Sequence, residues 1–338
     1  MKHYLKYTRK RVGGLMAQTY LGGVGMAAES VGASLVPSRG LGPLSNPVPT
    51  SNPLPTSNPL PNPVPTSTPY SKLALLIGCE YVTYEKKGTM KRLPGCHMDI
   101  KMAQKMLMEH YGYAKSDFII LSDETSSYPL QPTRDIILQK LKWIAEQCHR
   151  RPTLTQVVIY YSGHGTQTPD KNGDEEDGMD ECLVPSDFME KGLIIDDMFF
   201  DCIWSKLPLS VKVTCIFDCC NSGTIFDLPY RYDGKLFRRD EKVTPQKLST
   251  PLPLIVTVSG CHDPQTSASA YKLERNIDWE GAMSYALREV LKRHSYSPTP
   301  VSTLIDEMRT LLAQLKFSQI PQLGTSREVL PGQITQLF

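Results

Sequence analysis

Continuous apolar runs that end in small or polar residues constrain this fold more than any other feature of the sequence. Such runs occupy residues 73–78, 118–121, 156–161, 211–217 and 254–259. Unbroken apolar runs of this length are typical of strands that are buried on both faces. Between and after them, apolar side chains recur at helical spacing over residues 96–111, 132–148, 281–294 and 301–315. Strands alternating with helices predict an α/β fold, a mainly parallel sheet flanked by helices on both faces.

The helix expected over 132–148 illustrates the pattern. Ile137, Leu141, Ile144 and Cys148 fall on one stripe of a 3.6-residue period. Pro132 is expected in its first turn, where the missing N–H has no partner to lose.

Composition excludes several classes of protein. The chain has 338 residues, 40% of them apolar, and a net charge of +2, which gives no case for nucleic-acid binding. Residues 12–28 are too weakly apolar to span a bilayer, so no membrane association is expected. The basic stretch 2–11 allows a signal or transit peptide, although an ordinary N-terminal arm is favoured.

The cysteines indicate a reducing compartment. There are nine, an odd number, with no Cys-x-x-Cys spacing for zinc. Cys79 and Cys215 lie within apolar runs and are expected to be buried thiols. A reduced, cytoplasmic protein is the simplest interpretation.

Domain boundaries follow changes in composition. Residues 45–66 form a degenerate proline-rich repeat, expected to be extended or disordered, which serves as a spacer or as a docking site for a proline-binding domain. We therefore expect an N-terminal arm and prodomain over 1–70 and one folded domain over 71–338. The folded domain divides into 71–229, a basic, turn-rich linker 230–251, and 252–338. A second polar loop, 170–181, carries seven carboxylates.

Two polar segments follow neighbouring predicted strands. His164 lies between Gly163 and Gly165, so nothing is expected to cover its ring. Cys219 and Cys220 follow the next strand. Carboxyl ends of parallel strands meet at one edge of a sheet, and an imidazole beside a thiol is the usual means of activating it. The alternative is a histidine with a purely structural role. The residues favour a cysteine peptidase, with the N–H groups of Gly165 and Cys220 as oxyanion donors.

Three ordered blocks resemble the signature motifs of the metacaspases, in the caspase-like clan of cysteine peptidases. They are Tyr161-Ser162-Gly163-His164-Gly165-Thr166-Gln167, Asp218-Cys219-Cys220-Asn221-Ser222-Gly223, and Ser259-Gly260-Cys261-His262-Asp263-Pro264-Gln265-Thr266-Ser267-Ala268. The resemblance covers about residues 72–338, and the block order and proline-rich arm are similar to type I members. It implies a caspase-like fold, His164 as general base and Cys220 as nucleophile. Asn221 stands where the family usually has histidine.

The resemblance also implies cleavage after arginine or lysine. Cys96, Asp99, Ser162 and Asp218 match the positions that line the specificity pocket in the family. Two carboxylates beside the nucleophile suit a guanidinium, which binds carboxylates through paired N–H groups. The alternatives are a first-turn acid for Asp99 and a helix cap for Asp218.

Many metacaspases need calcium, and the family's site corresponds to Asp180, Asp196, Asp197 and Asp227. Carboxylates without matching cations suit Ca²⁺ rather than zinc. The alternative is that Asp196 and Asp197 only begin a helix that runs to residue 204. The acidic loop 170–181 lacks the glycine of an EF-hand and is expected to bind calcium weakly at most.

Further expectations concern processing and assembly. Exposed basic residues at Lys72, Arg238, Arg239 and Lys272 are candidates for self-cleavage of a zymogen. The resemblance implies a monomer. The rival function is a non-catalytic interaction protein that recruits partners through its proline-rich arm, and Asn221 alone supports it. A cysteine phosphatase is disfavoured because no arginine follows either cysteine in a short phosphate-binding loop.

Overall fold

A computed structural model describes residues 71–124, 126–169, 178–219, 228–239, 251–260, 269–270 and 280–338. Several predicted features lie outside the described residues. They are the arm and proline repeat over 1–70, most of the acidic loop, Cys220, Asn221, Asp227, most of the linker, most of the third motif and Lys272.

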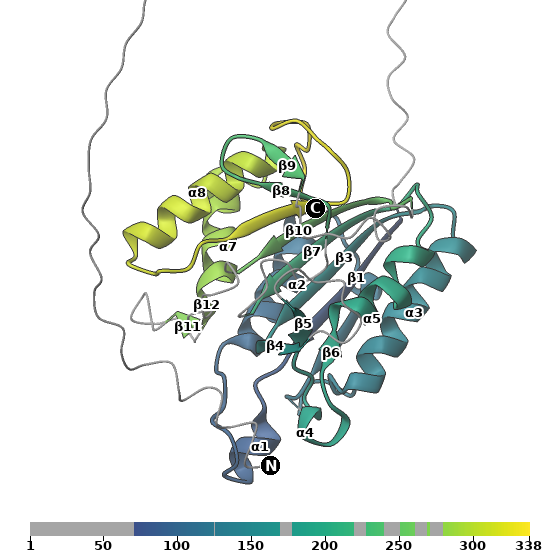
Figure 1. Cartoon of the computed structure of the whole chain (residues 1–338), viewed down its shortest axis with the longest axis vertical. Helices are drawn as coiled ribbons and strands as arrows, with labels where there is room; N and C mark the ends of the chain where they lie inside the picture. The colour runs from purple at the N-terminus through teal and green to yellow at the C-terminus, as the bar shows by residue number, and fades with distance from the viewer. Residues whose placement is uncertain are drawn as a thin grey trace, which may run out of the picture. The chain divides into compact units, whose positions relative to one another are not determined.

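An eight-stranded sheet forms the centre of the fold, in the order β2-β1-β3-β7-β10-β13-β8-β9 (Figure 1). The first five strands in that order are parallel and the last three pair antiparallel. The bounds are β1 Ser71–Gly78, β2 Phe118–Ser122, β3 Leu154–Ser162, β7 Lys212–Asp218, β10 Leu254–Ser259, β13 Gln322–Thr325, β8 Tyr230–Tyr232 and β9 Phe237–Arg239. All five strands expected from the apolar runs are present, and the mainly parallel sheet is confirmed.

Helices cover both faces of this sheet, as predicted. The helices α3 (Arg134–Arg150) and α5 (Asp196–Cys202) pack on one face, while α2 (Cys96–His110), α7 (Ala282–Arg293) and α8 (Val301–Gln314) pack on the other (Figure 1). Alternate residues of each strand enter the two cores; Leu75 belongs to the first and Leu76 to the second. Both cores consist of buried apolar side chains.

The start of α3 differs from the prediction. Its apolar stripe is buried as expected, but the helix begins at Arg134, and Thr133 before it is extended. The Asp187 carboxylate accepts the Arg134 N–H at 2.8 Å, and the Pro132 carbonyl accepts the N–H of Ser186 at 2.9 Å. Pro132 therefore precedes the helix, because its backbone is tied to a distant segment.

The remaining elements are short. A three-stranded sheet contains β4 (Gly165–Pro169), β5 (Met179–Leu183) and β6 (Ile194–Ile195), and a two-stranded one contains β11 (Ser269–Ala270) and β12 (Glu280–Gly281). The short helices are α1 (Val82–Lys86) and α4 (Phe188–Lys191), with 3-10 turns at Lys115–Asp117 and Trp204–Lys206. Strand β5 includes the end of the predicted acidic loop.

Two expectations about the basic residues need correction. The predicted linker begins with the hairpin β8–β9, which extends the central sheet and contains Arg238 and Arg239. Lys72 is not an exposed junction residue: it lies within β1, and its ammonium group donates to the Tyr111 carbonyl and lies 5.1 Å from the Tyr113 ring centroid. Within the described residues, only the two arginines remain exposed candidates for self-cleavage.

Candidate functional site

The strand register brings the predicted site residues to one edge of the sheet. Gly78 at the end of β1 is level with Ser162 at the end of β3, and Ser162 is level with Asp218 at the end of β7. Backbone bonds continue past these ends: the Cys79 N–H donates to the Ser162 carbonyl at 2.9 Å, and the Gly163 N–H donates to the Asp218 carbonyl at 3.3 Å. The side chains that follow β1, β3 and β7 therefore start from fixed positions.

His164 is held by aromatic residues. Its ring stacks on Tyr81, with the centroids 4.9 Å apart and the planes 28° apart. Its backbone N–H donates to the Tyr81 hydroxyl at 2.8 Å, and the Tyr161 hydroxyl donates to its carbonyl at 2.8 Å. The expectation that nothing covers this ring is wrong, because the loop after β1 places Tyr81 against it.

Burial lowers the pKa of His164 below its usual value. The imidazole is therefore neutral at neutral pH and able to accept a proton. Among the described residues, stacking on Tyr81 and the hydrogen bonds of its own backbone hold the His164 ring in place.

Gly163 allows this packing because it has no side chain. A Cβ at this position would lie 2.6 Å from the Tyr161 hydroxyl and 3.2 Å from the Cys79 Cβ. A larger residue would push Tyr161 away from the His164 carbonyl. The glycine before the histidine thus serves close approach here rather than exposure of the ring.

The four predicted pocket residues do lie together. Ser162 Oγ donates to Asp99 Oδ2 at 2.6 Å, and the Cys96 thiol contacts Ser162. Asp99 and Asp218, which we call the acidic pair, are 2% and 5% exposed. Burial first, and the charge of Asp218 second, raise the pKa of Asp99 well above its ordinary value. Two adjacent buried like charges favour a proton or a cation between them.

The start of α7 supplies donors to both carboxylates. The Gly281 N–H donates to Asp99 Oδ1 at 2.8 Å, and the Ser284 N–H and hydroxyl donate to Asp218 Oδ2 at 2.9 and 2.7 Å. Gly281 approaches so closely that a Cβ would lie 3.0 Å from Asp99 Oδ2 and nearer still to the Asp218 carboxylate. The alternatives considered for these aspartates are compatible with this geometry: Asp99 lies in the first turn of α2, and Asp218 binds the first turn of α7.

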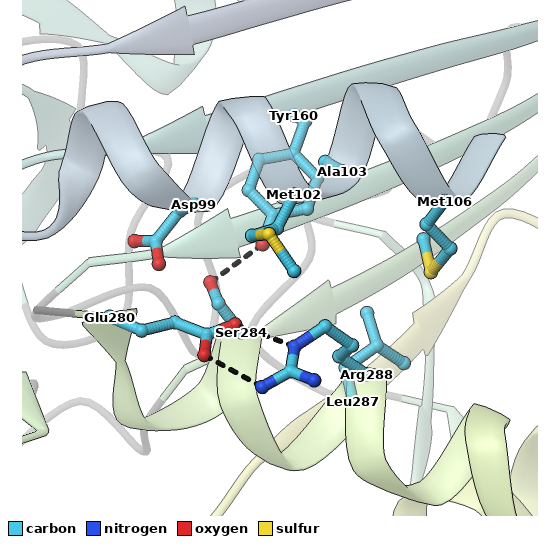
Figure 2. Close-up of a pocket in the computed structure, with 9 residues that line it drawn as sticks. All are labelled: Asp99, Met102, Ala103, Met106, Tyr160, Glu280, Ser284, Leu287 and Arg288. Atoms are coloured by element: carbon cyan, nitrogen blue, oxygen red, sulfur yellow. Dashed lines mark hydrogen bonds and ion pairs between the residues drawn. The ribbon is translucent and has the colours of Figure 1, made fainter. Parts of the chain in front are cut away.

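Figure 2 shows the cleft beside Asp99, between α2 and the start of α7. Glu280, 5% exposed, accepts two hydrogen bonds from Arg288, at 3.0 Å from Nε and 2.9 Å from Nη2. The Tyr160 hydroxyl donates to Ser284 Oγ at 2.6 Å and links the floor of the cleft to α7. A third acid therefore lies on this wall, already paired with a guanidinium of the chain itself.

Two of the three described residues of the predicted calcium site, Asp180 and Asp196, lie near the Cys182 thiol. Asp180 and Asp196 are 4% and 2% exposed, and Asp197 lies in the first turn of α5. Burial raises the pKa of Cys182, and the charges of Asp196 and Asp180 raise it further. Within the described ranges no three acidic, histidine or cysteine side chains form a metal-binding group. Asp227, the fourth predicted ligand, lies outside them.

Other predicted catalytic groups are only partly described. Gly165 opens β4 opposite Leu183 in the neighbouring strand. Cys219 is fully buried, which leaves Cys220 as the candidate nucleophile, although Cys220 itself lies outside the described residues.

Sequence reasoning missed Tyr81, Gly281, Ser284 and Glu280. Tyr81 could have been found by the rule used for His164, because it closely follows the end of β1 at the same sheet edge. The other three come from a segment far along the chain, and no local pattern in the sequence joins them to Asp99 or Asp218.

Comparisons with known proteins show which family this chain resembles. Residues 72–229 match the family described as metacaspase, peptidase C14 domain. A Metacaspase-1 from Yarrowia lipolytica is 33% identical over 300 residues, which cover 75% of this chain and 61% of that protein. A Metacaspase-1 from Scheffersomyces stipitis is 31% identical over 301 residues, which cover 75% of this chain and 70% of that protein. The chain thus spans about two thirds of the length of these relatives.

A solved structure is similar in fold. The protein GSU0716 from Geobacter sulfurreducens superposes with a TM-score of 0.53 at 21% identity, covering 78% of this chain and 97% of that one. In the part of the chain that the structure describes, no helix is long and apolar enough to cross a membrane.

Proposed function

The chain belongs to the metacaspase family, and on this premise we propose that it is a cysteine endopeptidase that cleaves after arginine or lysine. Protein and peptide chains are its substrates. The observation that carries the proposal is the strand register Gly78–Ser162–Asp218, because it puts a candidate base and a buried acidic pair at one edge of the sheet.

The proposed reaction proceeds through an acyl-enzyme. Neutral His164 accepts the proton of the Cys220 thiol as the sulfur attacks the carbonyl carbon of the scissile bond. The N–H groups of Gly165 and Cys220 stabilise the oxyanion. The imidazolium then protonates the leaving amine, and a water molecule, deprotonated by His164, hydrolyses the thioester and restores the thiol.

The acidic pair supports the proposal that the substrate carries a basic residue before the cleaved bond. Asp99 and Asp218 each carry a buried carboxylate, and the described guanidinium on the cleft wall, that of Arg288, is already paired with Glu280. A substrate guanidinium or ammonium would place a positive charge beside two adjacent buried carboxylates and offset their repulsion. Cys96 and Ser162 complete the same wall.

Release of a dye from peptides tests this proposal. We expect turnover of arginyl and lysyl peptides, none of an aspartyl peptide, and loss of turnover in Cys220→Ala and in His164→Ala. Faster turnover of the aspartyl peptide would contradict the specificity. Absence of hydrolysis with any substrate from a library, with and without calcium, would favour the non-catalytic interaction protein.

We further propose that calcium activates the enzyme through Asp180, Asp196, Asp197 and Asp227. The chemistry of the donor set fits this ion: Asp180 and Asp196 are buried acids that act on the same thiol, and oxygen ligands suit Ca²⁺. A bound cation would offset their mutual repulsion and order the segments that carry them.

Calorimetry of calcium binding and a thermal melt test this independently of turnover. We expect calcium to raise the melting temperature of the wild type and to leave that of Asp196→Asn unchanged, with affinity in about the millimolar to sub-millimolar range. An identical shift in both proteins, or turnover unaffected by a chelator, would contradict the proposal. Sequencing the termini of incubated enzyme would reveal self-cleavage after Arg238 or Arg239.

A further inference from the structure

Tyr81 has an unusual backbone conformation for a large side chain. Its φ and ψ are 60° and 37°, in the left-handed region that bulky residues rarely adopt, and it is 1% exposed. A conformation of this kind persists only where surrounding contacts fix it, and it is often found at functional sites.

One carboxylate fixes this conformation. The N–H groups on both sides of Tyr81, those of Glu80 and Val82, donate to Asp123 at 2.9 and 3.2 Å. Asp123 also contacts the His97 ring, with 2.6 Å between Oδ1 and Nε2. Burial opposes ionisation of Asp123, but the bonds from His97 and from these backbone groups outweigh it and lower its pKa. The anion is therefore stable, and the loop after β1 is fastened to the end of β2.

The Tyr81 hydroxyl is the partner of the His164 backbone. It accepts the His164 N–H at 2.8 Å and donates to the Val184 carbonyl at 2.8 Å. Val184 in turn donates its N–H to the His164 carbonyl at 3.2 Å. Both backbone polar groups of His164 are thus engaged by a loop 83 residues earlier and by the segment after β5.

The Tyr81 ring acts on the imidazole itself. At 4.9 Å between centroids and 28° between planes, it restricts rotation of the His164 ring. When His164 takes up a proton during the reaction, its positive charge arises over the face of the Tyr81 ring. A cation over an aromatic face is more stable than a neutral ring in the same place. The contact therefore strengthens as the transition state forms, which is what accelerates a chemical step.

We propose that Tyr81 is a positioning residue for the general base: it orients His164 through its hydroxyl and stabilises the imidazolium through its ring. This inference rests on the proposed function, in which His164 is the base. In other nucleophilic enzymes a third catalytic partner orients the histidine. Here a stacked tyrosine takes that role. A buried acid at this place would raise the pKa of the imidazole; the tyrosine orients the ring and adds no charge.

Two variants separate the two roles. Tyr81→Phe keeps the ring and removes the hydroxyl, which leaves the buried His164 N–H without its acceptor. We expect kcat for an arginyl peptide to fall about tenfold, with KM unchanged. Tyr81→Leu removes both contacts, and we expect kcat to fall about 100-fold, again with little change in KM.

Tyr84→Leu is the matched control. Tyr84 is 2% exposed, lies three residues later in α1, and packs on Phe188 as Tyr81 does, but its hydroxyl donates to Glu190 rather than to the His164 region. Its loss should lower the melting temperature about as much as Tyr81→Leu and leave kcat within about twofold.

The outcomes are distinct. A normal kcat in Tyr81→Leu, or an equal loss of kcat in Tyr84→Leu, would overturn the inference and leave the proposed function intact. Hydrolysis that survives His164→Ala would remove the proposed function and the inference with it. If Tyr81→Leu does not fold, Tyr81→Phe decides alone: a tenfold lower kcat at constant KM supports the inference, and an unchanged kcat overturns it.

Discussion

The surroundings of His164 and those of the acidic pair are built from opposite kinds of groups. His164 is held by tyrosine hydroxyls, a stacked ring and backbone groups, none of which carries a charge. Asp99 and Asp218 are held by N–H and hydroxyl donors, and each lies in the field of the other.

Burial favours the neutral form in both places, but with different consequences. It lowers the pKa of His164, so the ring is ready to accept a proton at neutral pH. It raises the pKa of Asp99, so this carboxyl is protonated more readily until a cation arrives. His164 is therefore ready to act as a base before the substrate binds, whereas the acidic pair gains its counter-charge from the substrate.

The largest effect is expected from neutralising one member of the acidic pair, which tests whether the pair recognises the charge of the substrate. In Asp99→Asn or Asp218→Asn, kcat/KM for an arginyl peptide should fall about 100-fold or more, because a buried charge pair with the substrate is lost. An amide can still accept a hydrogen bond at each position, so the fold should survive. Steady-state kinetics check this, and a loss below about threefold would contradict the assigned role.

A smaller effect is expected from Gly281→Ala. The added Cβ would meet both members of the acidic pair, so α7 or the carboxylates must move. We expect a loss of about 1–3 kcal/mol in the free energy of unfolding and a several-fold rise in KM, with kcat less affected. Denaturant unfolding and kinetics measure the two quantities. Wild-type values for both would show that α7 does not close the pocket.

The smallest expected effects are those of pH. Because the pKa of Asp99 is raised, KM for an arginyl peptide should fall as pH rises through that pKa, whereas KM for a neutral analogue should not. Because the pKa of His164 is lowered, kcat should persist below pH 6.5. It should be lost only as pH falls through the pKa of His164 in the folded protein.

The same pKa shifts affect stability with opposite signs. The unfolded chain binds the His164 proton more readily than the folded one, so this group makes acidification below about pH 6.5 destabilising. For Asp99 the folded state binds the proton more readily, so its contribution to stability falls as pH rises from its unfolded pKa to its folded pKa. Kinetic profiles and melts recorded over the same pH range would reveal whether both groups titrate in these directions.

Features of the fold and the site were predictable where they depend on residues close together in the sequence. The stripe Ile137–Leu141–Ile144 and the strands that carry His164 and Asp218 follow from local periodicity, and both were predicted. The conformation of Tyr81 could not be predicted, because it depends on Asp123. This residue lies 43 positions from Glu80, and no local sequence pattern connects the two. The contact between Gly281 and Asp99 could not be predicted either, because the two residues are 182 positions apart in the sequence. Motifs located the site, while long-range contacts determine how it is held.

The most direct test of the central claim compares an arginyl peptide with its citrullinyl counterpart, which has nearly the same shape and no charge. At saturating calcium, we expect a kcat/KM ratio of about 100 or more in the wild type. We also expect this ratio to fall toward one in Asp99→Asn. Equal turnover of the two peptides by the wild type would show that the acidic pair does not recognise the charge of the substrate.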